Sequence, residues 1–151
     1  MKQELQYLVI HCTATPAGRE VTSDDIRRWH TDPPPAGRGW SQVGYTDLFH
    51  INGGVERLVD NNEDGFVDDW EVTNGVAGFN SVCRHIVYAG GMTADMSAPM
   101  DTRSQMQKDA MKKYVQSFMF KFPGARVIGH RDLNPDKACP SFDVGQWLKT
   151  F

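Results

Sequence analysis

The segment Tyr7-Leu8-Val9-Ile10-His11-Cys12 is the clearest strand signal in the sequence. A short apolar run rich in β-branched residues is typical of a buried β-strand. Side chains alternate along a strand, so if His11 faces a site, Cys12 faces the opposite way, into the core. We therefore expect a buried strand that carries a histidine near its end.

Helix signals lie on both sides of the middle of the chain. Thr22-Ser23-Asp24-Asp25 and Thr102-Arg103-Ser104-Gln105 each place a hydroxyl residue three positions before an acidic or amide residue, which predicts two capping boxes. The helices that follow are expected to end near His30 and Lys121, and a last helix follows Asp143. The apolar positions of the longer helix recur at helical spacing and are expected in the core: Met106, Met111, Val115, Phe118 and Met119.

The order of the remaining elements defines the fold class. Four more strands are expected at residues 46–51, 55–59, 85–89 and 126–129, with a hairpin turn at Asn52-Gly53-Gly54. The resulting order of strands and helices predicts an α/β fold with a mixed sheet of about five strands flanked by helices. The 151 residues correspond to a single domain, residues 1–151.

Composition limits the classes of function. Hydrophobic residues make up 40% of the chain and charged residues 23%, which is ordinary for a globular protein. A net charge of −3 argues against a nucleic-acid partner and against a polybasic membrane patch. We find no signal peptide and no apolar run of the roughly 20 residues that a membrane helix needs. We therefore expect synthesis in a cytoplasm and no membrane anchor.

The second informative stretch is Gly129-His130-Arg131-Asp132-Leu133-Asn134-Pro135-Asp136-Lys137-Ala138-Cys139-Pro140-Ser141-Phe142-Asp143. Imidazole and thiolate are ligands that zinc prefers, and the prolines keep this segment from being one helix. With His11, the residues His130 and Cys139 make three ligands and leave one zinc position open, as hydrolysis requires. A closed structural site is the alternative, but only Cys12 or His30 could supply its fourth ligand.

Several segments in this order resemble one family. They are 10–15 (IHCTAT), 26–30 (IRRWH), 39–45 (GWSQVGY), 78–80 (GFN), 129–132 (GHRD) and 137–143 (KACPSFD). The chain is similar to the zinc-dependent N-acetylmuramoyl-L-alanine amidases of type 2, the family of phage T7 lysozyme and the peptidoglycan recognition proteins. The resemblance covers nearly the whole chain and implies a mixed sheet with helices on both faces.

The resemblance also implies roles for single residues. His11, His130 and Cys139 match the zinc ligands, Tyr45 and Lys137 match the two catalytic side chains, and the loop with Asn80 lines the substrate groove. The implied reaction cuts the amide between N-acetylmuramic acid and the L-alanine of the stem peptide. Tyr45 would hydrogen-bond the attacking water or the oxyanion, and Lys137 would stabilise the oxyanion. The general base is either Tyr45 or a carboxylate that the sequence does not place.

Some positions depart from the family pattern. Thr46-Asp47 stands where the family more often has a histidine and an apolar residue, and Asn74-Gly75 replaces a histidine that several relatives carry. Without the motif set, Tyr45 would be a core aromatic and Lys137 a surface charge. We interpret His50 and His85 as ordinary strand residues.

The resemblance implies that the segment 60–71 (DNNEDGFVDDWE) is an insertion relative to the phage lysozyme, and this segment fits the spacing of an EF-hand calcium loop. The six calcium ligands would be Asp60, Asn62, Asp64, Phe66 through its carbonyl, Asp68 and Glu71. A strand precedes it, so a complete EF-hand is not expected. The alternative is an acidic, solvated surface turn.

The function expected from these features is that of a phage or prophage endolysin, with zinc as cofactor, possible calcium, and peptidoglycan as substrate. It would act on the bacterial cell wall after release, as a monomer. Two alternatives stay open. One is a non-catalytic peptidoglycan-binding module, although such modules lose the cysteine ligand that Cys139 would supply here. The other is a wall-recycling or effector amidase.

Overall fold

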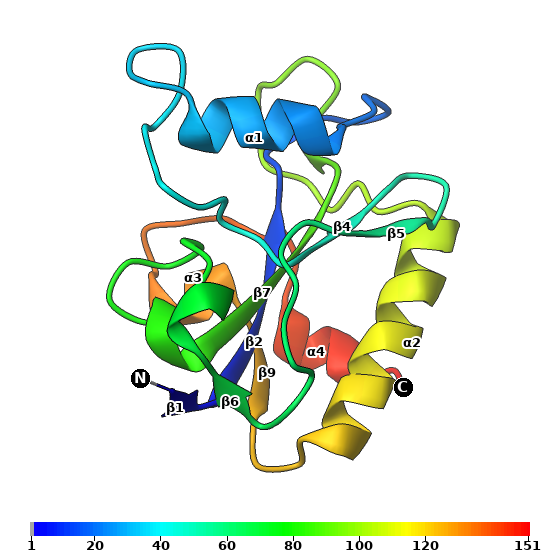
Figure 1. The fold of residues 1–151 in the computed structure, drawn as a ribbon. Coiled ribbons are helices and arrows are strands. Elements are labelled where there is room, and N and C mark those ends of the chain that lie inside the picture. The colour runs from blue at the N-terminus through cyan, green and yellow to red at the C-terminus, as the bar shows by residue number, and fades with distance from the viewer. Residues whose placement is uncertain (1) are drawn as a thin grey trace.

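The computed structural model describes residues 2–151, and a five-stranded sheet in the order β5-β4-β7-β2-β9 forms its centre (Figure 1). The neighbouring strands β4, β7, β2 and β9 are parallel, and β5 joins the edge antiparallel to β4. Their bounds are β2 Tyr7–Cys12, β4 Asp47–Phe49, β5 Val55–Arg57, β7 Cys83–Tyr88 and β9 Arg126–Gly129. The mixed sheet predicted from the sequence is therefore confirmed, and the strand ends differ from the predicted ones by no more than two residues.

Helices cover both faces of this sheet (Figure 1). The long helix α2 and the short helix α4 pack on one face, and α1 packs on the other. Their bounds are α1 Ser23–Thr31, α2 Gln105–Lys121, α3 His130–Leu133 and α4 Val144–Leu148, with 3₁₀ turns at η1 Asp69–Glu71 and η2 Asn80–Val82. Two small sheets pair β1 Gln3–Glu4 with β6 Phe66–Val67 and β3 Thr15–Pro16 with β8 Gly91–Met92.

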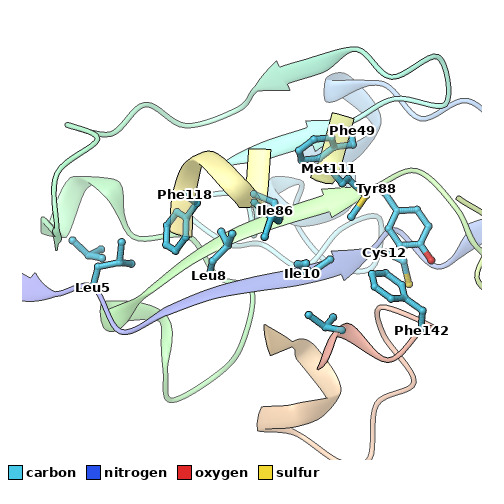
Figure 2. Packing of buried hydrophobic residues seen from close by; sticks show 13 residues of the cluster. Leu5, Leu8, Ile10, Cys12, Phe49, Ile86, Tyr88, Met111, Phe118 and Phe142 are labelled. Atoms are coloured by element: carbon cyan, nitrogen blue, oxygen red, sulfur yellow. The ribbon is translucent and has the colours of Figure 1, made fainter. Parts of the chain in front are cut away.

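The larger core lies between the sheet and α2 (Figure 2). Leu8, Ile10 and Cys12 of β2 belong to the same buried cluster as Met111 and Phe118 of α2, and Cys12 lies beside Phe142. Full burial of one such side chain stabilises a fold by about 1.5–3 kcal/mol. The predicted alternation is confirmed, because Cys12 faces this core and His11 must face the other side of the sheet.

Helix α1 begins as predicted. The Thr22 hydroxyl accepts a hydrogen bond from the Asp25 amide at 3.1 Å, and the Asp25 carboxylate accepts one from the Thr22 amide at 3.0 Å. This reciprocal capping box satisfies two backbone donors that the first helical turn leaves free. It holds the helix that carries His30 toward the sheet.

The predicted cap of α2 was wrong by two residues. Ser104, not Thr102, caps the helix, in a capping box with Gln107. The Thr102 hydroxyl instead accepts a hydrogen bond from the Gly91 amide at 2.8 Å. Both hydroxyl residues precede an amide residue by three positions, so the local pattern alone could not choose between them.

Two methionines predicted for the core were also misplaced. Met106 is 61% exposed and Met119 42% exposed, whereas Met111, Val115 and Phe118 are buried. A helix advances about 100° per residue, so Met106 lies about 140° around the axis from Met111. The buried stripe of α2 is narrower than the sequence suggested.

Among the helices formed by residues 2–151, none combines the length and the apolar character that crossing a membrane requires.

Candidate metal centre and its cavity

The proposed metal ligands meet where the parallel strands β2 and β9 end. The register pairs Ile10 with Gly129. His11 and His130 are the next residues after these two, so they lie at the same edge of the sheet. The Arg131 amide donates to the Cys139 carbonyl at 2.9 Å and brings the loop after α3 back to this edge. Ligand sites of α/β sheets commonly lie beyond the carboxyl ends of the strands.

The three side chains form a compact donor set. One ligand atom from each of His11, His130 and Cys139 lies within 4.8 Å of the other two. The His11 Nδ1 and Cys139 Sγ atoms are 3.7 Å apart. Tetrahedral zinc, with Zn–N of about 2.0 Å and Zn–S of about 2.3 Å, separates such atoms by roughly 3.5 Å. The donor types and their spacing therefore fit zinc.

Cys12 lies behind this set. Its side chain faces the core, while its amide donates a hydrogen bond to Cys139 Sγ at 3.3 Å. The hydrogen bond with the Cys12 thiol and burial raise the pKa of the Cys139 thiol. A metal ion bound by Cys139 must therefore displace a proton from it.

His85 was interpreted as an ordinary strand residue, and that interpretation was wrong. It is fully buried on β7, and its Nδ1 atom lies 2.9 Å from His11 Nε2. Burial lowers the pKa of His85 to about 3, and it also lowers the pKa of His11. The sequence by itself gave no signal for this contact, because the contact depends on how β7 pairs with β2: Val9 is opposite His85, which places His85 on the His11 face.

Tyr45 lies beside the donor set, as the resemblance implied. Its ring centroid is 5.1 Å from that of His11 and 5.2 Å from that of His30. Burial raises the pKa of Tyr45, so its hydroxyl is a neutral hydrogen-bond donor. The Gly44 amide donates to His30 Nδ1 at 2.9 Å, and burial lowers the pKa of His30 to about 4. His30 therefore does not offer Nδ1 as a fourth metal ligand.

These side chains open into a cavity of about 530 Å³, here called the histidine cavity. Its cationic walls come from Lys137, which is exposed, and from Arg38. Trp40 also lies in the wall of this cavity. The described residues that line the cavity include no carboxylate: His11, His30, Arg38, Trp40, Ser41, Tyr45, Asn74, Gly75, Ala77, Asn80, His130, Asn134 and Lys137. A carboxylate base is thus not part of this wall.

Comparisons with known proteins identify relatives of this chain. No protein-family model matches the chain. The endolysin of Enterobacteria phage K11 is 32% identical over 149 residues, which cover 99% of this chain and 89% of that protein. The chain belongs to the phage endolysin family. The endolysin of Escherichia phage T7 is 28% identical over 149 residues, which cover 97% of this chain and 87% of that protein.

Solved structures show the same fold as this endolysin. The Ph2119 endolysin from a Thermus scotoductus bacteriophage superposes with a TM-score of 0.73 at 23% identity, covering 97% of this chain and 84% of that one. The N-acetylmuramoyl-L-alanine amidase LysC of Clostridium intestinale superposes with a TM-score of 0.70 at 19% identity, and the match covers 93% of this chain and 78% of that one. A single-residue mutant of Drosophila PGRP-LB in complex with tracheal cytotoxin superposes with a TM-score of 0.63 at 20% identity, and the match covers 93% of this chain and 79% of that one.

In this endolysin the Asn80 side chain lines the histidine cavity, yet its oxygen is already engaged. Asn80 Oδ1 accepts a hydrogen bond from the Val76 amide at 2.8 Å and lies 2.9 Å from His85 Nε2. Asn80 therefore connects the cavity wall to the buried histidine pair. A role in substrate binding, implied by the resemblance, would fall to its Nδ2 group.

No residue of the acidic segment 60–71 is among those that line the histidine cavity, and the strand β6 within this segment pairs with β1 (Figure 1). Glu71 is buried, and its two carboxylate oxygens accept hydrogen bonds from the Asn62 and Asp68 amides at 3.3 and 3.2 Å. Within residues 2–151, only the His11 set brings three potential ligand side chains of the His, Cys, Asp and Glu types together. Calcium binding by this segment stays a prediction.

Proposed function

We propose that this endolysin is a zinc-dependent N-acetylmuramoyl-L-alanine amidase. It would hydrolyse the amide between N-acetylmuramic acid and L-alanine in peptidoglycan. The observation that carries the proposal is the meeting of His11, His130 and Cys139 within 4.8 Å beside a cavity that Tyr45 and Lys137 also line. Two imidazoles and one thiolate form a catalytic type of zinc site, because they leave one coordination position for water.

The site residues divide into a metal-binding and a substrate-facing group. Zinc held by the three ligands would supply a water with a pKa of about 7 and would polarise the scissile carbonyl. The neutral Tyr45 hydroxyl donates a hydrogen bond to the attacking water or to the developing oxyanion. Lys137 stabilises the same negative charge as a cation, and a donor of this kind is worth about 3 kcal/mol in the transition state.

The cavity wall also suits the proposed substrate. Arg38 and Lys137 present positive charge, and no described lining residue is acidic. The stem peptides of peptidoglycan carry free carboxylates, which such a wall attracts. One related structure is named as an N-acetylmuramoyl-L-alanine amidase, and another is a complex with tracheal cytotoxin. Both names support an acidic muropeptide as the substrate class.

We infer phage-directed lysis as the biological setting, because three relatives that match nearly the whole chain are named endolysins. The protein would act as a monomer on the bacterial cell wall. Tyr45 and Lys137 line the same cavity as His11 and His130, and Cys139 lies beside these two histidines. This arrangement favours an enzyme over a binding module.

Digestion of purified peptidoglycan tests the proposal. Products are read by mass spectrometry with the protein untreated, treated with a strong zinc chelator, and reloaded with zinc. We expect free stem peptides with an L-alanine amino terminus, lost on chelation and restored by zinc. Intact muropeptides from the zinc-loaded protein would instead identify a binding module, and cleavage unaffected by the chelator would contradict the role of zinc.

A further inference from the structure

The buried pair of His11 and His85 continues into Asn80, so three side chains form one hydrogen-bonded chain. The His11 Nε2 and His85 Nδ1 atoms are 2.9 Å apart, and His85 Nε2 is 2.9 Å from Asn80 Oδ1. His85 is held in place on β7, and Asn80 begins the 3₁₀ turn η2 directly before that strand. The chain therefore runs from the cavity wall to the first proposed zinc ligand.

The backbone fixes the direction of this chain. The Val76 amide can only donate, and it lies 2.8 Å from Asn80 Oδ1, so that atom is the carbonyl oxygen of the side chain. The same oxygen can only accept from His85, so His85 Nε2 carries the hydrogen. A fully buried imidazole without a carboxylate partner among the described residues is neutral, which leaves Nδ1 of His85 as an acceptor.

The consequence reaches His11. Because His85 Nδ1 accepts, His11 Nε2 must carry the hydrogen, and His11 Nδ1 keeps a free lone pair. That Nδ1 atom is the one that lies 3.7 Å from Cys139 Sγ. We propose that His85 and Asn80 are positioning residues, which hold His11 in the Nε2–H tautomer and turn its Nδ1 lone pair toward His130 and Cys139. This inference rests on the zinc site proposed above.

Gly75 belongs to the same arrangement. A Cβ atom at Gly75 would lie 2.5 Å from Cγ and Nδ1 of His85, closer than real Cβ contacts. The imidazole of His85 therefore occupies the space that any side chain at position 75 would need. The glycine at this position has a packing reason, and Gly75→Ala should displace the His85 ring from His11.

The first test is the tautomer itself. Long-range ¹H–¹⁵N spectra of the imidazoles are recorded on the zinc-free, full-length protein, which needs no variant. We expect His11 to give the pattern of the Nε2–H tautomer before any metal is added. The Nδ1–H tautomer at His11 in the folded wild-type protein would overturn the proposal.

The second test is zinc affinity, measured by competition with a chromophoric chelator. His85→Phe keeps an aromatic ring but removes the acceptor, so we expect zinc to bind about 10–100-fold more weakly, as for other lost partners of metal-binding histidines. His85→Gln again offers an acceptor and a donor and should retain more of the affinity. Gly75→Ala should weaken zinc binding in the same direction. Gly124→Ala is the matched control, because nothing lies within 4 Å of a Cβ there.

Three results would separate the possible failures. Wild-type zinc affinity in His85→Phe, with its fold verified by circular dichroism, would refute the positioning role even if the amidase activity is real. If His85→Phe does not fold, the tautomer of His11 in the wild-type protein still tests the positioning role. A zinc-loaded wild-type protein with the expected tautomer but without stem-peptide release would refute the amidase and leave the metal-site geometry intact.

Discussion

Two of the cavities lined by the described residues are similar in size but differ in how their polar groups are used. The histidine cavity has a volume of about 530 Å³, and a second cavity of about 640 Å³ lies beside α2. We call the second one the α2 cavity; it is lined by Arg57, Arg84, Tyr114 and Lys121 among others. Charged side chains therefore line both cavities, so neither volume nor charge alone identifies the functional one.

The difference lies in the pairing of these groups. At the α2 cavity, the buried Asp47 accepts hydrogen bonds from Arg57 Nε and the Tyr114 hydroxyl, both at 2.7 Å, and Arg57 also pairs with Glu63 at 3.3 Å. Beside the histidine cavity, two imidazole nitrogens and one sulfur bring their lone pairs within 4.8 Å of one another. Paired groups stabilise a fold, whereas convergent lone pairs are available to a metal ion.

Removing one metal ligand should give the largest effect. In Cys139→Ser we expect loss of bound zinc and a fall in peptidoglycan hydrolysis by several orders of magnitude, because the pKa of the attacking water returns from about 7 toward about 15.7. Metal analysis and muropeptide release measure both quantities. Cys83→Ala is the control, since Cys83 is buried apart from the metal ligands. Hydrolysis by Cys139→Ser at the wild-type rate would contradict the assignment of the histidine cavity, and not the α2 cavity, as the functional one.

Substitutions of the two side chains proposed to contact the substrate should give the second largest effect on hydrolysis. Tyr45→Phe and Lys137→Ala are each expected to lower kcat by about 10²–10³-fold while zinc stays bound, because each removes one donor to the oxyanion. Steady-state kinetics and metal analysis test this. Lys113→Ala changes a lysine of the α2 cavity and should leave kcat unchanged. An equal loss in both lysine variants would contradict a special role of the histidine cavity.

The paired groups of the α2 cavity should affect stability instead of catalysis. Asp47 is 2% exposed, so Asp47→Ala leaves the Tyr114 hydroxyl and Arg57 without their partner and should lower the free energy of unfolding by about 2–3 kcal/mol. Urea denaturation measures this change. Glu63→Ala removes only an exposed partner of Arg57 and should cost less than about 1 kcal/mol. Weakened zinc binding in folded Asp47→Ala would show that the two regions are not independent.

The smallest expected effect concerns the acidic segment near the α2 cavity. If residues 60–71 bind calcium, an ion concentration of ten times Kd should raise the free energy of unfolding by about 1.4 kcal/mol. Thermal denaturation and calorimetry with calcium measure it. Asp60→Asn alters an exposed proposed ligand and should weaken the effect. A melting temperature and calorimetric baseline unchanged by calcium would leave the histidine cavity as the metal site of this protein.

Sequence reasoning was most successful where the signal is local or depends on a motif. The capping box at Thr22, the hairpin turn at 52–54 and the alternation of His11 and Cys12 were predicted and are confirmed. The ligand set of His11, His130 and Cys139 was chosen from residue types and from the resemblance, and the fold brings the three together. Such features depend on backbone geometry within a few residues or on chemistry that few residue types provide.

Other features were decided only by the tertiary structure. The partner of His11 depends on the register between β2 and β7, and the choice of Ser104 over Thr102 as the α2 cap depends on the Gly91 amide, 11 residues away from Thr102. The exposure of Met106 depends on which stripe of α2 meets the sheet. Register and packing arise from contacts between segments distant in sequence, so local patterns permit several arrangements and the complete fold selects one.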